Sequence, residues 1–164
     1  MPFGYASGVR SLALLVALVL LPGAASCDDV RTVDARYATP ERTLDTLLAG
    51  YGLEGKSLAE IQTLRRTGRV RVRDDDAVRG CFESFEGPED EALAGFVVGA
   101  IAEADGSLRT TMTPGVARVA TGERATIVLH DHDGAWRIDL HASVPGTVRE
   151  GIHQQVMRAR NEAP

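Results

Sequence analysis

The sequence lacks the short motifs that mark the common catalytic and cofactor sites. It contains no Gly-x-Ser-x-Gly nucleophile motif, no Ser-x-x-Lys pair, no glycine-rich phosphate loop and no Cys-x-x-Cys pair. No residue can therefore be assigned a catalytic role from a motif, and we expect no cofactor.

Positive charge and aromatic residues are also scarce. The chain has 18 Lys and Arg residues against 23 Asp and Glu residues, which gives a formal net charge of -5. An acidic balance with scattered basic residues argues against nucleic acid as a partner. Aromatic residues make up only 5% of the chain, so a core must depend on Leu, Val, Ile and Ala. The length suits one domain with a single core.

No apolar run is long enough to cross a membrane as a helix, which takes ~20 residues. The longest run is Leu12–Leu21, which follows the positive charge of Arg10 and is ended by Pro22. A charged start, an apolar centre and small residues at the end are typical of a secretory signal peptide. We therefore predict a signal peptide over residues 1–26 and an extracytoplasmic location.

The end of this leader carries a further signal. Ala24, Ala25 and Ser26 lead directly into Cys27, and this ending resembles that of bacterial lipoprotein signals. The resemblance implies that Cys27 is lipidated, becomes the first residue and anchors the protein to a membrane. Ordinary signal cleavage stays open, because Ala24 and Ser26 also fit a small-x-small site, and it would give a soluble periplasmic or secreted protein.

The only other cysteine is Cys81. If Cys27 carries lipid, Cys81 is a lone thiol; if Cys27 is free in an oxidising compartment, a Cys27–Cys81 disulfide becomes possible. Cys81 stands beside Phe82 in an apolar helical pattern, which favours a small buried hydrophobic residue.

The rest of the chain divides into three predicted parts. Residues 27–38 are expected to hold the lipidation site and a polar tether, residues 39–160 a single α+β domain, and residues 161–164 a tail. Apolar residues at helical spacing, together with capping residues, predict several helices. These helices are expected to begin near Thr39, Ser57, Asp76 and Gly87, with a last one through Val148–Val156.

Alternation with period two predicts the strands. Arg69–Arg73 alternates arginine with valine and is predicted as an early strand. Asp133-Gly134 is a strong hairpin signal between the last two strands. The later strands are expected at Leu108–Met112, Val116–Ala120, Ala125–His130 and Ala135–His141.

A two-residue turn sets the register of this hairpin, with His130 opposite Arg137 and Leu129 opposite Ile138. The register separates an apolar face from a polar face, whereas a slip of one residue would mix them. The apolar face is predicted to carry Ile127, Leu129, Trp136, Ile138 and Leu140. The polar face is predicted to carry His130, His132, Arg137, Asp139 and His141.

Helices first, an antiparallel sheet last, an opening Pro40-Glu41 helix and the terminal strand sequence of Asp133–Ile138 resemble one known family. This is the nuclear-transport-factor-like (SnoaL-like) superfamily, whose domain is a cystatin-like cone and which occurs in many small bacterial lipoproteins. The resemblance covers residues 39–145 and implies N-terminal helices packed on a curved antiparallel sheet. A helical segment near Val78–Phe85 and the C-terminal helix depart from its usual layout.

His130 and His132 are the candidate metal ligands, because a His-x-His pair puts both imidazoles on one face of a strand, where zinc can use them. A third ligand is needed. His141 would lie four residues along the strand from His130, ~13 Å away, and Arg137 separates Asp139 from the pair. A polar hairpin end facing solvent explains these histidines without a metal, so we predict no metal site.

Two other surfaces are candidate binding sites. Arg69, Arg71 and Arg73 form either a patch for an anionic partner, such as lipid head groups, or a solvated strand face. A ligand pocket, if the sheet is concave, would lie between its apolar face and the helices. Its expected lining residues are Tyr51, Phe96, Trp136, Ile138 and Leu140, although Trp136 fits equally well in the core.

We therefore predict an exported, lipid-anchored envelope protein that acts as a non-catalytic binding module for an unknown small molecule or envelope protein. Two alternatives stay open. One is a small isomerase-like or hydrolase-like enzyme using a cone-shaped apolar cavity, which a buried Asp, Glu or His with a shifted pKa would favour. The other is an adaptor that presents the arginine patch to a membrane or protein.

Overall fold

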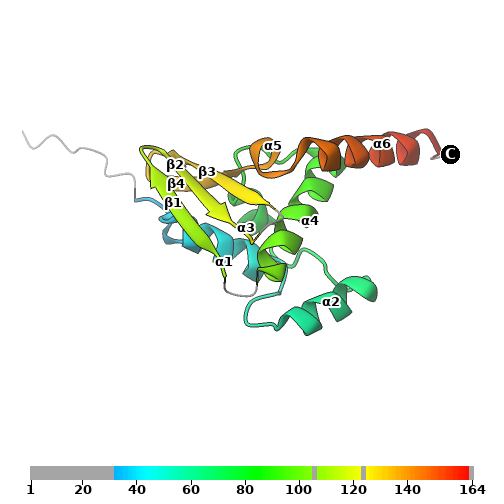
Figure 1. The fold of residues 1–164 in the computed structure, drawn as a ribbon, viewed down its shortest axis with the longest axis horizontal. Coiled ribbons are helices and arrows are strands. Elements are labelled where there is room, and N and C mark those ends of the chain that lie inside the picture. The colour runs from blue at the N-terminus through cyan, green and yellow to red at the C-terminus, as the bar shows by residue number, and fades with distance from the viewer. Residues whose placement is uncertain (1–31, 105–106, 123–124, 163–164) are drawn as a thin grey trace, which may run out of the picture. The chain divides into compact units, whose positions relative to one another are not determined.

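The computed structural model describes residues 32–104, 107–122 and 125–162. The predicted signal peptide, Cys27 and the start of the predicted tether lie outside these residues. The described part has an α+β fold in which helices pack with an open four-stranded antiparallel sheet, and its last element is a helix (Figure 1). The predicted fold class and C-terminal helix are thus confirmed. Within the described residues, no helix is both long and apolar enough for a membrane span.

The sheet is a simple meander in which each strand pairs with the next one along the chain. The four strands are β1 (Arg109–Thr113), β2 (Val116–Ala120), β3 (Thr126–His132) and β4 (Ala135–Asp139).

The β3–β4 hairpin has the predicted register. Leu129 pairs with Ile138, and His130 pairs with Arg137. Asp133 and Gly134 both have positive φ, 55° and 88°, as the favoured two-residue turn between twisted strands requires. The apolar face packs into the core, where Leu129 and Ile138 have no exposed surface.

The last strand is shorter than predicted. β4 ends at Asp139, and Leu140 begins the short helix α5 (Leu140–Ser143), so Leu140 does not pair with Ile127 and His141 leaves the sheet. The Asp139 carboxylate caps α5 by accepting a hydrogen bond from the Ala142 amide at 2.9 Å. Alternation along the sequence extends past this point, but the cap gives the backbone a local alternative to the ladder.

Helices α1 (Pro40–Gly50) and α2 (Leu58–Arg66) begin at the predicted caps. The Thr39 hydroxyl accepts from the Arg42 amide, and Ser57 forms a capping box with Glu60. Helix α3 (Asp75–Gly80) begins slightly earlier than predicted, because Asp74 rather than Asp76 caps it.

Helix α1 contacts β4, and the Thr43 hydroxyl donates a hydrogen bond to the Trp136 carbonyl at 2.9 Å across this interface. Helix α4 (Gly87–Glu103) contacts α1, α2 and α5. It also supports α6 (Gly146–Glu162), none of whose residues is fully buried. The predicted tail therefore starts later than residue 161, since Asn161 and Glu162 are helical.

The predicted strand at Arg69–Arg73 is wrong, because this segment is irregular and has no strand partner in the described part of the chain. Its ends bond to helices: the Arg69 amide donates to the Leu64 carbonyl at 2.9 Å, and the Arg73 amide donates to the Gly50 carbonyl at 2.7 Å. Alternation alone does not make a strand without a neighbouring edge to pair with.

The predicted tether is also too long. Residues Ala35–Tyr37 form a 3₁₀ turn, and Tyr37 is buried in the core, where its hydroxyl donates to the Ala77 carbonyl at 3.1 Å. Burial raises the pKa of this phenol. The packed unit therefore begins before residue 39.

Cys81 is fully buried, which confirms its predicted place as a small hydrophobic core residue. Its thiol contacts the Ala77 carbonyl at 3.2 Å, and burial raises its pKa to about 12. Cys81 therefore stays a protonated, unreactive thiol near neutral pH. Cys27 lies outside the described residues, so the disulfide alternative stays open.

Candidate functional site

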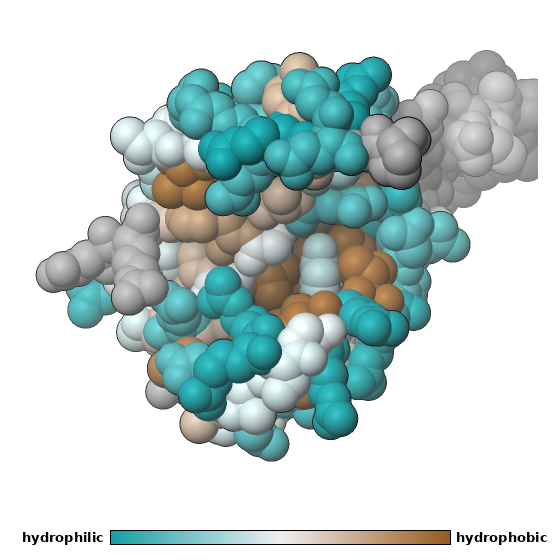
Figure 2. Space-filling model, turned by 90° about the vertical axis from the view of Figure 1, so that its right-hand side faces the viewer, coloured by the Kyte–Doolittle hydropathy of each residue, from teal (hydrophilic) through white to brown (hydrophobic). Residues whose placement is uncertain are grey.

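Among the hollows and side-chain clusters of the described surface, two are candidate binding sites. The first is a pocket of about 410 Å³ between α2 and α4, which we call the α2–α4 pocket. Figure 2 faces this side of the domain, where apolar side chains gather in a hollow between hydrophilic ridges. The pocket is lined by Tyr51, Leu53, Ile61, Arg65, Gly68, Val70, Ala92, Gly95, Phe96, Val98 and Gly99.

The structure brings together two of the five residues predicted to line a pocket. Tyr51 and Phe96 both line the α2–α4 pocket. Trp136, Ile138 and Leu140 do not line this pocket and are buried in the hydrophobic core, with exposed fractions of 9%, 0% and 3%. Tyr51 belongs to the same core and is also 9% exposed, so it lies at the floor of the pocket. The apolar face of the sheet is thus covered by packed side chains, and the hollow lies on the outer side of α4.

Among the described residues that line the α2–α4 pocket, Arg65 is the one cation. Its guanidinium forms a long ion pair with Glu103 at 3.4 Å and lies against Gly99, where a Cβ would come within 3.2 Å of it. The Tyr51 phenol supplies the other polar side chain, and burial, followed by the charge of Glu91, raises its pKa. The described lining residues include no Asp, Glu or His.

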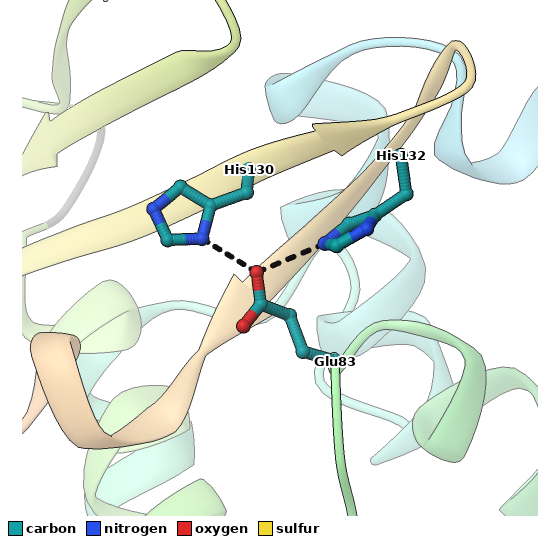
Figure 3. Close-up of side chains that lie close together, drawn as sticks. All are labelled: Glu83, His130 and His132. Carbon is teal, nitrogen blue, oxygen red and sulfur yellow. Dashed lines mark hydrogen bonds and ion pairs between the residues drawn. The ribbon is translucent and has the colours of Figure 1, made fainter.

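The second feature is a cluster of three polar side chains, Glu83, His130 and His132, which we call the Glu83 cluster (Figure 3). One carboxylate oxygen, Glu83 Oε1, lies 2.5 Å from His130 Nδ1 and 3.0 Å from His132 Nε2. The three potential ligand atoms all lie within 4.8 Å of one another. The carboxylate thus lies between two imidazoles that come from one strand.

Strand β3 places the two histidines side by side. They are two residues apart, so both project from the polar face of the hairpin. The residue opposite His132 is the small Ala135, and the residue opposite His130 is Arg137. The Arg137 guanidinium lies over the Tyr37 ring, 4.5 Å from its centroid, and is thereby held by an aromatic neighbour.

The segment after α3 places Glu83. It runs along the free edge of β4, where the Ile138 amide donates to the Cys81 carbonyl at 2.7 Å and the Glu83 amide donates to the Ile138 carbonyl at 3.1 Å. Phe82 and Phe85 are buried and stacked with their ring centroids 5.2 Å apart. These anchors on both sides of Glu83 fix its backbone, so its side chain reaches over β4 toward β3.

The cluster faces solvent. The exposed fractions of its side chains are 28% for Glu83, 35% for His130 and 55% for His132. Without a metal, the carboxylate can accept one N–H from each ring. When the two nitrogens that face the carboxylate, His130 Nδ1 and His132 Nε2, carry no proton, they and Glu83 Oε1 form a set of metal ligands.

Sequence reasoning identified the two histidines and missed the third member. Glu83 is 47 residues from His130 and 49 from His132, and no local pattern marks it. The two other candidate third ligands lie elsewhere: Asp139 caps α5, and His141 lies in α5 with its Nδ1 3.3 Å from the Arg149 guanidinium. Two apolar residues followed by an acid, as in Cys81-Phe82-Glu83, are too common a pattern to predict the contact of Glu83 with the two histidines.

Arg69, Arg71 and Arg73 are all exposed, but they lie on an irregular segment and share no strand face. The Arg73 side chain covers Gly52, where an added Cβ would collide with it. Binding of an anionic partner by these three residues remains a prediction.

Comparison with family models, with curated proteins and with solved structures gives no match to this chain.

Proposed function

We propose that this protein is an exported, lipid-anchored binding domain that holds a small apolar molecule with one anionic group in the α2–α4 pocket. The observation that carries the proposal is the combination of apolar walls with one cation, Arg65, among the lining residues that the structure describes. Leu53, Ile61 and Phe96 would cover the apolar part of the ligand, and the guanidinium would bind its anionic end.

The size of the pocket supports a small ligand. Its volume of about 410 Å³ is at the lower end of the range typical of small-molecule sites, roughly 300–1,000 Å³. Arg65 is available for an anion, because its contact with Glu103 is long, at 3.4 Å, and about half of its side chain is exposed. An exposed pair of this kind contributes little stability, so a ligand carboxylate can compete for the guanidinium.

The chemistry of the pocket favours binding over catalysis. General acid–base catalysis needs a group that exchanges a proton near the operating pH, usually His, Asp or Glu. The described lining residues hold none. The buried polar residues of the described chain are Thr43, Thr121 and Ser143, whose hydroxyls all bond to backbone groups.

The location is part of the same proposal and is supported by the leader sequence. A lipid anchor on Cys27 would hold the domain at a membrane surface, in keeping with the resemblance to lipoproteins that carry a nuclear-transport-factor-like domain. Several acyl chains give stable anchoring, because each buried methylene contributes about 0.8 kcal/mol.

We expect protein purified from its native membranes to begin at Cys27 and to carry the mass of the lipid modification. Intact-mass measurement checks both. Cys27→Ala should release the protein from the membrane fraction, whereas Cys81→Ala, the matched control at the other cysteine, should not. A native N-terminus at Met1 without lipid would contradict export and anchoring.

We expect charge reversal at Arg65 to weaken binding of an apolar anion by at least tenfold, because an attractive contact becomes a repulsive one. A suitable probe is the fluorescent anion 1-anilinonaphthalene-8-sulfonate, titrated against Arg65→Glu and against Arg66→Glu. Arg66 is the next residue of α2 and is not among the pocket's lining residues, so Arg66→Glu matches the change in net charge and should bind like the parent.

Two further measurements separate the pocket from non-specific adsorption. The uncharged probe N-phenyl-1-naphthylamine should bind Arg65→Glu as it binds the parent. Gly95→Leu should block both probes, because nothing lies within 4 Å of a Cβ at Gly95 and the new side chain fills the hollow. Equal binding of the anion by the parent, Arg65→Glu and Gly95→Leu would exclude the proposed site.

A further inference from the structure

We propose that Glu83, His130 and His132 form a binding site for a divalent transition-metal ion, and that Zn²⁺ suits it best. Two imidazole nitrogens and one carboxylate oxygen converge within 4.8 Å. Imidazole favours zinc and its neighbours in the first transition row over Mg²⁺ and Ca²⁺, which take oxygen ligands. The site shares no residue with the α2–α4 pocket and goes beyond the function proposed above.

The geometry needs only a small adjustment to admit the ion. Two ligand atoms on one tetrahedral zinc lie about 3.4 Å apart, since each is about 2.1 Å from the metal. Glu83 Oε1 is 2.5 Å from His130 Nδ1 and 3.0 Å from His132 Nε2. The carboxylate must therefore retreat from His130 by about 0.9 Å, which a side chain can do by small rotations about its own bonds.

The backbone around the site is held in place, which favours binding. His130 and His132 lie on a paired strand, and Glu83 lies between the two buried phenylalanines Phe82 and Phe85. Because three ligands are already assembled, the ion does not have to order a loop before it binds. Preassembly of this kind distinguishes the cluster from histidines scattered on a surface.

The surrounding charges permit a cation. Arg137, the cross-strand partner of His130, is the basic residue on this face of β4, and its guanidinium lies over the Tyr37 ring. The Glu83 carboxylate supplies one negative charge. The Arg36 guanidinium, also near Tyr37, is paired with Asp34 at 2.7 Å.

The exposed position of the cluster points to exchangeable binding. Three protein ligands leave at least one position of a four-coordinate zinc for water or another ligand. Solvent reaches all three side chains, so the ion can enter and leave directly. The site is therefore suited to capture and release of a metal at the surface of the domain.

The test is calorimetric titration of the metal-stripped full chain with ZnCl₂, followed by the same titration of three variants. We expect one Zn²⁺ per chain. His130→Gln, His132→Gln and Glu83→Gln should each weaken binding by at least tenfold, because loss of even an outer partner of a zinc ligand commonly has an effect of that size. Co²⁺ should give the visible spectrum of a tetrahedral site, and each variant should lose it.

The chain offers a matched control. His153 Nδ1 lies 3.1 Å from Glu89 Oε2, an exposed His–Glu contact with a single histidine. His153→Gln removes such a contact elsewhere on the surface and should leave zinc binding unchanged. Thermal unfolding of each metal-stripped variant verifies that the fold is intact.

Two results would overturn the proposal. One is binding that falls equally in His153→Gln, since the metal would then be held by surface histidines in general. The other is full affinity in Glu83→Gln, because the His-x-His pair alone would then account for binding and the third ligand would have no role.

Discussion

Ile138→Ala should lower the free energy of unfolding by about 2–5 kcal/mol, the usual result of truncating a fully buried large aliphatic side chain to alanine. Ile138 has no exposed surface and pairs with Leu129 in the sheet. On its other side, its backbone amide and carbonyl bond to Cys81 and Glu83. Backbone hydrogen bonds on both sides limit how far the chain can collapse around the cavity, which places the expected loss in the upper part of this range.

Urea unfolding followed by circular dichroism measures this loss. Met112→Ala is the matched control, since it truncates another large strand residue, 53% exposed, and should change stability by less than about 0.5 kcal/mol. A loss below about 1 kcal/mol for Ile138→Ala would mean that the β4 edge and the Cys81–Glu83 segment are not packed as the structure has them.

The parts of the fold that the sequence predicted correctly are those set by local chemistry. The Asp133-Gly134 turn fixes the hairpin register within a few residues, and the register then assigns each side chain to a face. The caps at Thr39 and Ser57 act over three residues. Turns and caps of this kind depend on only a few consecutive residues, so packing against other elements seldom changes them.

The sequence predictions are wrong or incomplete where the structure of a segment depends on residues far along the chain. Arg69–Arg73 has the alternation of a strand, but its amides bond to helical carbonyls at Leu64 and Gly50. Glu83 joins the histidines only because its segment pairs with β4, far along the chain. The sequence thus predicts two members of the Glu83 cluster, the histidines, but not the carboxylate that makes it a candidate metal site.

The pocket prediction shows the same division. Tyr51 and Phe96 were identified as inward-facing from helical spacing, and both line the α2–α4 pocket. The sheet residues were identified as apolar with equal success, and they are buried in the core. Periodicity reports which face of an element is covered, but it does not report whether a neighbouring side chain or a ligand covers it.

Gly80→Ala should lower the free energy of unfolding by about 1–3 kcal/mol, although alanine is normally favoured over glycine in a helix. A Cβ at Gly80 would collide with the Tyr37 hydroxyl and lie 2.6 Å from its ring carbon Cζ. The phenol cannot easily move away, because Tyr37 is buried and its hydroxyl donates to the Ala77 carbonyl. The new methyl group therefore displaces the segment that precedes α1.

A double-mutant cycle isolates this contact. Tyr37→Leu removes the end of the ring that the new methyl meets, so the further effect of Gly80→Ala in that background should fall to less than about 0.5 kcal/mol. Gly95→Ala is the control for helix propensity, because its Cβ meets nothing within 4 Å and the change should stabilise the protein by about 0.5–1 kcal/mol. Equal losses from Gly80→Ala in both backgrounds would show that Tyr37 does not pack on α3. In that case residues 32–38 would be the tether that their composition predicts, and the domain would begin at α1.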